Sequence, residues 1–230
     1  PRLSKPGCPR CGEATTHGEH CGACLHKPPH FASTTAVFRY EFPVDRMIHS
    51  LKYAHQLALA PWLGAQLAEA VSSLSFDGIV AMPLHESRLR ERGFNQALEI
   101  ARPVATARKI RLSEQFILRT RTTQVQAGLP LKARHANLRG AFECTRDLSG
   151  KTILLIDDVM TSGSTLREAA RILALHGAGP ITVAELGIGL MTLTWPRLLI
   201  FPHTAYQPGG FGIGVFFVFH PVLACITCCL

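Results

Sequence analysis

One segment decides the fold of this 230-residue chain: Ile153-Leu-Leu-Ile-Asp-Asp-Val-Met-Thr-Ser-Gly-Ser-Thr165. Its four opening apolar residues are typical of a strand buried on both faces of a parallel sheet. Ligands of such sheets bind beyond the carboxyl ends of the strands, where two carboxylates, Asp157 and Asp158, emerge. The small residues that follow offer hydroxyls and backbone N–H groups at a helix start, which suits a phosphate. The segment therefore predicts a pocket for a phosphorylated ribose.

The predicted pocket would hold a ribose 5-phosphate at both ends. We expect Asp157 and Asp158 to accept hydrogen bonds from the 2′ and 3′ hydroxyls, while the loop binds the 5-phosphate. The loop consists of Thr161, Ser162, Gly163, Ser164 and Thr165. The alternative is an acidic strand end that merely caps a helix. The combination of strand, paired acids and small-residue loop favours ligand binding.

The residues around this segment predict the fold class. A helix is expected from about Thr165 to Gly177, with Thr165 and Glu168 as its capping box, and a strand from Ile181 to Leu186. Strand, helix and strand form a right-handed βαβ unit. We therefore predict an α/β fold with a parallel sheet flanked by helices, preceded by a small zinc ribbon.

The zinc ribbon is predicted from two C-x-x-C pairs, Cys8 with Cys11 and Cys21 with Cys24. Two loops that each present two thiolates can close a tetrahedron around zinc, and four sulfur ligands leave no open position. We therefore expect a structural zinc. Two disulfides or four unrelated thiols are the alternatives, and disulfides fit poorly with a chain in which no secretory signal is visible. The expected location is the cytoplasm.

Composition allows one core of ordinary size and a small accessory module, since 47% of the residues are apolar and 17% are charged. The formal charge of +8 favours an anionic partner without choosing among a nucleic acid, a membrane surface and a small phosphate compound. We expect a zinc-ribbon module at 1–30, a linker and accessory segment at 31–77, a core at 78–189 and an atypical apolar tail at 190–230.

The chain resembles the ComF family, whose core is similar to type I phosphoribosyltransferases. Five motifs carry the resemblance over residues 8 to about 188: the four cysteines, Leu51-Lys52-Tyr53, the segment from Pro83 to Gln96, Arg134 with Asn137 through Phe142, and the segment from Ile153 to Thr165. The resemblance implies a phosphoribosyltransferase-type domain that binds 5-phosphoribosyl-1-pyrophosphate (PRPP) with magnesium. It also implies a link to DNA uptake in natural competence.

The resemblance assigns Asp157 and Asp158 to the ribose and to catalysis, and residues Thr161 to Thr165 to the 5-phosphate. Arg88, Arg92, Asn95 and Gln96 follow the first core strand, where such enzymes place their pyrophosphate loop. Guanidinium groups suit pyrophosphate oxygens, although solvated loop charge is the alternative for these arginines. The expected activity is phosphoribosyl transfer to an acceptor that the sequence does not identify. The rival is a non-catalytic module that senses PRPP or a nucleotide, or handles single-stranded DNA with a competence helicase.

The tail departs from the family. After Arg197 it contains no Asp, Glu, Lys or Arg, and Phe211 to Leu230 is nearly all apolar. A tail anchor in a membrane, an extra strand pair and an altered reading frame are three interpretations. The abrupt change in composition favours the altered frame, so we do not expect a membrane partner unless the tail is an anchor.

Overall fold

The computed structural model describes residue 3 and residues 7–113, 116–121 and 138–189. The apolar tail at 190–230 and two residues of the family motifs, Arg134 and Asn137, lie outside these residues. None of the helices among the described residues is long and apolar enough to cross a bilayer.

The core is a five-stranded, fully parallel sheet in the order β1-β7-β6-β2-β3. Its strands are β1 (Ser33–Arg39), β2 (Gly78–Ala81), β3 (Leu112–Ser113), β6 (Ile153–Met160) and β7 (Ile181–Ile188). The apolar run that opens β6 is buried throughout, as are all residues of β2. This burial agrees with a parallel sheet covered on both faces. The predicted α/β fold class is confirmed.

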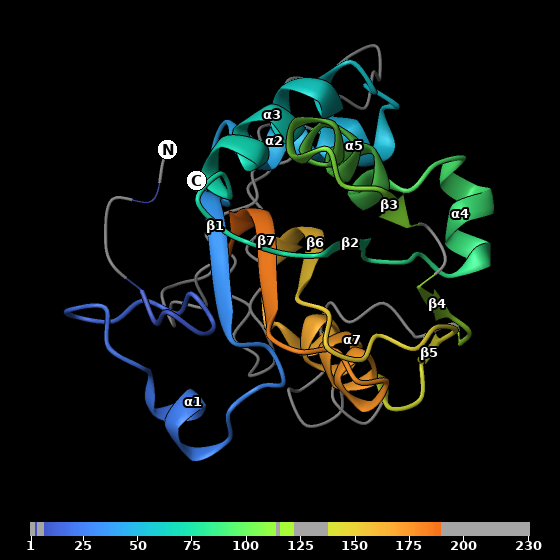
Figure 1. Cartoon of the computed structure of the whole chain (residues 1–230). Helices are drawn as coiled ribbons and strands as arrows, with labels where there is room; N and C mark the ends of the chain where they lie inside the picture. Colours follow the sequence, from blue (N-terminus) through green and yellow to red (C-terminus); the bar gives the residue numbers. More distant parts are fainter. Residues whose placement is uncertain (1–2, 4–6, 114–115, 122–137, 190–230) are drawn as a thin grey trace, which may run out of the picture. The chain divides into compact units, whose positions relative to one another are not determined.

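Helices cover the two faces of the sheet (Figure 1). On one face lie α2 (Val44–Tyr53), α3 (Leu59–Ala70) and α5 (Gln96–Arg108), and on the other lies α7 (Ser164–Leu175). The segment 31–77, expected as a linker and accessory part, supplies β1, α2 and α3. A short strand, β4 (Ile117–Arg119), pairs with β5 (Phe142–Cys144) in a separate antiparallel pair.

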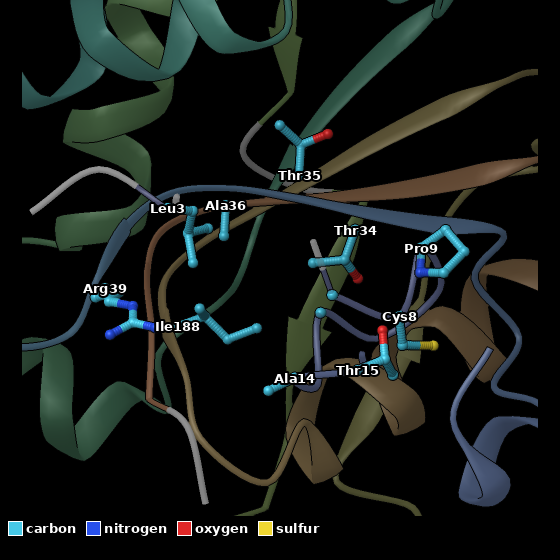
Figure 2. A pocket seen from close by; sticks show the side chains of 12 residues that line it. Leu3, Cys8, Pro9, Ala14, Thr15, Thr34, Thr35, Ala36, Arg39 and Ile188 are labelled. Atoms are coloured by element: carbon cyan, nitrogen blue, oxygen red, sulfur yellow. The ribbon is translucent and has the colours of Figure 1, made fainter. Parts of the chain in front are cut away.

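The cysteine module, residues 7–30, lies against the outer edge of β1 and contains α1 (Gly22–His26). The Thr34 backbone N–H donates to the Pro9 carbonyl at 3.1 Å, and the Thr34 hydroxyl donates to the Arg10 carbonyl at 2.7 Å. These bonds satisfy part of an edge that would otherwise expose unpaired backbone groups. A small pocket of about 290 Å³ remains between the module and β1, lined on the β1 side by Thr34, Thr35, Ala36 and Arg39 (Figure 2).

The helices α3 and α5 approach each other closely at Gly64. A methyl group at Gly64 would lie 2.6 Å from the Ile100 carbonyl oxygen and 2.6 Å from Pro103 Cγ. Both of these atoms belong to α5. The absence of a side chain at Gly64 therefore allows α3 and α5 to pack this closely.

We expect Gly64→Ala to lower the free energy of unfolding by about 1–3 kcal/mol, because the added methyl overlaps α5. The better helix propensity of alanine, about 1 kcal/mol, opposes this loss without removing it. Denaturant unfolding measures the change, with Ala65→Ser, exposed on the same helix, as the control within about 0.5 kcal/mol. A Gly64→Ala protein as stable as wild type would contradict the close packing.

Candidate functional site

The candidate site lies at the carboxyl end of β6, where the strand passes into the loop before α7. Asp157 and Asp158 are neighbours on β6, so their side chains point to opposite faces of the sheet. Asp158 is buried, with 4% of its surface exposed, whereas Asp157 is half-buried. The two acids that the sequence treats as a pair therefore have different surroundings.

Asp158 is held by groups of the protein itself. Its Oδ1 accepts the Val159 backbone N–H at 2.9 Å, and its Oδ2 forms an ion pair with Lys52 Nζ. Although burial lowers the pKa of Lys52, the Asp158 carboxylate outweighs burial, and the net pKa of Lys52 is raised. Each carboxylate oxygen of Asp158 thus has one partner within the protein.

Asp157 is the less buried of the two acids. Its Oδ1 accepts the Asp158 backbone N–H at 2.9 Å. Burial and, after it, the neighbouring Asp158 carboxylate raise the pKa of Asp157 to about 8, and the charge of Lys52 opposes this rise. Asp157 is therefore largely protonated at neutral pH in the free protein, and a cation or a positively charged ligand nearby would favour its ionised form.

A third acid lies beside the pair and has no counterpart in the sequence prediction. Glu185 on β7 is opposite Asp157 in the strand register and is fully buried. Neither of its carboxylate oxygens has a hydrogen-bond partner among the described residues. Burial, followed by the charges of Asp157 and Asp158, raises the pKa of Glu185 well above its usual range. Both effects favour the protonated, neutral form of Glu185.

The loop predicted to bind phosphate forms the start of α7. Gly163 precedes the helix with φ of 65°, a left-handed conformation that glycine adopts without strain. The Ser162 and Ser164 hydroxyls lie 3.0 Å apart. The predicted capping box of Thr165 and Glu168 is wrong, because α7 already begins at Ser164 with no side-chain cap.

Glu168 does not cap the helix but binds other groups. It accepts the Gly140 backbone N–H at 3.2 Å and pairs with Arg171 at 2.8 Å. These contacts fasten the segment before β5 to α7. The absence of a cap at the helix start leaves its first N–H groups available to an anion, which is what phosphate binding requires.

A cleft of about 990 Å³ adjoins this loop. Residues 161–164 line one side, and the cysteine module lines another through Cys11, Cys21 and the segment from His26 to Phe31. Four basic side chains also line it: Lys27, Arg139, Arg167 and Arg171. The small pocket of Figure 2 contains none of the residues predicted to bind the sugar phosphate, so the larger cleft is the cavity associated with the candidate site.

The predicted pyrophosphate residues follow β2 on α4 (Glu86–Arg92) and at the start of α5. Arg88 is partly buried and pairs with Glu91 at 3.0 Å. Arg92 donates to Gln96 Oε1 and lies over the Tyr53 ring, 5.2 Å from its centre. The structure thus brings Arg92 and Gln96 together, while Arg88 pairs with an acid of its own short helix.

Asn95 has a structural role in this geometry. Its Oδ1 accepts the Ala97 backbone N–H at 3.0 Å, so it caps α5, and its Nδ2 donates to the Met82 carbonyl at 3.0 Å. Both ends of the amide are occupied. Asn95 therefore joins the end of β2 to the start of α5.

Lys52 is a site residue that the sequence prediction did not include. It belongs to the family motif Leu51-Lys52-Tyr53, and its side chain is only 18% exposed and reaches Asp158. The signal was present: Val44, Ile48 and Leu51 form the buried face of α2, and Lys52 follows the last of them. Arg119 on β4 is a further group near the acids, because the charge of Asp157 opposes the lowering of the Arg119 pKa by burial.

The four cysteines form the candidate metal centre. The sulfur atoms of Cys8, Cys11, Cys21 and Cys24 all lie within 4.8 Å of one another, and the Cys11 and Cys21 sulfurs are 3.5 Å apart. Zinc–sulfur bonds of about 2.3 Å in a tetrahedron require sulfur separations of about 3.8 Å. The cluster therefore fits a four-coordinate metal such as zinc.

The fold and the site define a class, the phosphoribosyltransferase-like proteins, and the family model described as "Phosphoribosyl transferase domain" matches residues 98–187. Among solved structures, the purine phosphoribosyltransferase from Pyrococcus horikoshii is 18% identical over 71% of this chain and 83% of that one, with a TM-score of 0.36.

Curated relatives narrow the class to a family. DNA utilization protein YhgH of Escherichia coli K12 is 34% identical over 190 residues, which cover 79% of this chain and 84% of that protein. Competence protein F of Haemophilus influenzae is 30% identical over 191 residues, which cover 78% of this chain and 83% of that protein. The chain belongs to the ComF family.

We expect Glu185→Gln to stabilise the protein increasingly as pH rises. The folded-state pKa of Glu185 is raised, so wild type loses stability above the unfolded pKa of about 4.3. The variant lacks this loss. Their difference in free energy of unfolding should therefore be near zero below pH 4 and grow by at most about 1.4 kcal/mol per pH unit.

Denaturant unfolding between pH 4 and pH 8 measures this difference. The exposed Glu143 of β5 supplies the control, since Glu143→Gln removes an acid from the surface and its difference should vary with pH less than that of Glu185→Gln. A Glu185→Gln difference that varies with pH no more than the control would mean that Glu185 is ionised in the folded protein.

Proposed function

We propose that this protein binds PRPP with magnesium and transfers its phosphoribosyl group to an acceptor. The observation that carries the proposal is the arrangement at the end of β6. The half-buried Asp157 and an uncapped helix start at Gly163 and Ser164 lie six to seven residues apart in the same strand–loop–helix unit. One acid and one phosphate loop at this separation suit the two ends of a ribose 5-phosphate.

The division between the two acids makes the proposal more specific. Asp157 accepts hydrogen bonds from the ribose hydroxyls, and Asp158 holds Lys52 beside it. Lys52 thus brings a positive charge next to a pocket that receives a highly anionic ligand. The loop from Thr161 to Thr165 binds the 5-phosphate through backbone N–H groups, and Arg92 with Gln96 faces the pyrophosphate.

The reaction places few chemical demands on the protein. The bond between C1 of the ribose and the pyrophosphate oxygen breaks, and its electron pair leaves with the pyrophosphate. A lone pair of the acceptor then forms the new bond to C1. Magnesium, when bound with PRPP, neutralises charge on the leaving pyrophosphate, and it is held mainly by ligand oxygens with Asp157 as the available protein carboxylate. The residues named here orient the sugar and stabilise charge.

A second candidate function is a non-catalytic module that senses PRPP or a nucleotide and handles single-stranded DNA, with a helicase as partner. The four basic side chains of the cleft favour it, since phosphate backbones are bound by such groups. Pyrophosphate release from PRPP in the presence of a panel of nucleobases separates the two functions. Turnover supports the transferase, and binding without turnover supports the module.

We also propose that the four-cysteine centre holds zinc in a structural role. Four sulfur donors saturate a tetrahedral zinc and leave no position for a substrate. The module is too small to bury a core of its own, so the metal stabilises its fold. The expected location remains the cytoplasm.

Elemental analysis of freshly purified protein should find about one zinc per chain, because the four sulfur atoms fit one tetrahedral ion. Cys11→Ser should reduce the zinc content to a small fraction of this value. Cys144→Ser removes a buried cysteine of β5 outside the cluster, so it is the matched control and should retain full zinc. Less than about a third of an equivalent in wild type, with the cysteines oxidised in pairs, would refute the zinc centre.

The binding of PRPP should depend chiefly on Asp157. Calorimetry with magnesium present should show that wild type binds PRPP, and ribose 5-phosphate more weakly because it lacks the pyrophosphate. Asp157→Asn should weaken PRPP binding at least about tenfold, since a lost charge-assisted hydrogen bond costs about 1.5–3 kcal/mol.

Two further variants make this test specific. Asp158→Asn should lower the free energy of unfolding, because it leaves Lys52 buried without its partner. Asp147→Asn changes an exposed acid outside the site and should bind PRPP as wild type does. Wild type that ignores millimolar PRPP, or Asp157→Asn that binds it equally well, would contradict the proposed function.

A further inference from the structure

The cysteine module touches the helix that begins at the phosphate loop. Arg167, in the first turn of α7, places Nη2 3.9 Å from Cys24 Sγ and donates from Nη1 to the Lys27 carbonyl at 3.4 Å. Its backbone N–H donates to the Gly163 carbonyl at 2.9 Å. One residue therefore contacts a cysteine of the metal centre, the end of α1 and the loop glycine.

A second contact joins the same two parts through Met160, which is 4% exposed and directly precedes Thr161. A Cβ at Gly163 would lie 3.1 Å from Met160 Sδ, and a Cβ at Gly12 would lie 3.8 Å from Met160 Cε. Gly12 follows Cys11 in the first cysteine knuckle. The Met160 thioether thus fills the space between that knuckle and the phosphate loop.

Both glycines leave little room for movement at this contact. Gly12 and Gly163 have φ of 72° and 65°, and a Cβ at Gly12 would lie only 2.2 Å from Ile188 Cδ1. Phosphate binding by backbone N–H groups requires donor–acceptor distances near 2.9 Å, so small displacements of the loop matter. The position of the first knuckle is therefore transmitted to the loop by packing.

We propose that Arg167 is a positioning residue that couples the four-cysteine centre to the phosphate loop, so that metal binding to the cysteines strengthens phosphate binding at α7. The inference rests on the proposed function, because it requires the loop to bind a sugar phosphate. Without a metal, the four sulfur atoms have no common centre, and Cys24 with α1 can move away from Arg167. The first turn of α7 then loses the Arg167 contact, one of its two contacts with the cysteine module; the other is made by Met160.

Linkage gives a test on the intact protein. If zinc strengthens the binding of ribose 5-phosphate, ribose 5-phosphate must strengthen the binding of zinc by the same factor. Equilibrium competition with a chromogenic chelator measures zinc affinity with and without saturating ribose 5-phosphate. We expect wild type to hold zinc about fivefold more tightly when the sugar phosphate is present, at the lower end of measured couplings.

Variants of two arginines separate positioning from simple attraction. Arg167→Met should abolish the effect of ribose 5-phosphate on zinc affinity, and Arg167→Lys, which keeps the charge without the two-pronged contact, should abolish most of it. Arg171 lines the same cleft but pairs with Glu168, so Arg171→Met removes an equal charge. It should retain the full effect.

The outcomes are distinguishable. Calorimetry that detects binding of neither ribose 5-phosphate nor PRPP overturns the proposed function and this inference with it. Binding of ribose 5-phosphate with unchanged zinc affinity in wild type overturns the coupling alone. Equal loss of the effect in the Arg167→Lys and Arg171→Met proteins would also overturn it, because general electrostatic attraction would then be the cause.

Discussion

The ion pair between Lys52 and Asp158 is the interaction on which the site depends. Two adjacent acids at the end of a central strand enter a region of low dielectric, where an unpaired charge is very costly. The protein resolves this by two different means. Asp158 binds Lys52, while the raised pKa values of Asp157 and Glu185 favour the protonated forms of these two acids. The helix α2 must therefore deliver Lys52 to this point, and its buried face of Val44, Ile48 and Leu51 fixes it there.

This arrangement suits the proposed ligand, an anionic compound that binds together with a divalent cation. In the free protein, the acids of β6 and β7 hold few net charges, so repulsion between them and a phosphate compound is small. A bound divalent cation would displace the proton from Asp157 and place a carboxylate beside the ribose. Asp158 takes no part in this displacement of a proton, because its two carboxylate oxygens already bind Lys52 and the Val159 N–H.

Sequence periodicity predicted the fold class, the buried run of β6 and the cysteine cluster because each is a local pattern. Contacts between residues far apart in the sequence could not be predicted from such local patterns. The approach of Lys52 to Asp158 spans about 100 residues, and the unpartnered burial of Glu185 depends on the register between β6 and β7. The capping box at Thr165 matched a local motif, but Glu168 has stronger partners in Arg171 and Gly140. Asn95 likewise matched a binding motif, yet tertiary contacts engage both ends of its amide.

The cysteine module and the transferase-like core also depend on each other for structural reasons. About thirty residues cannot bury enough apolar surface to fold alone, so the module needs a metal and a surface to dock on. The core has an outer strand, β1, whose edge needs cover, and the module supplies the Pro9 and Arg10 carbonyls to Thr34. Docking at this edge places the first knuckle against Ile188 and Met160. Since Met160 ends β6 and the phosphate loop begins at the next residue, a module that merely covers an edge necessarily lies against the ligand site.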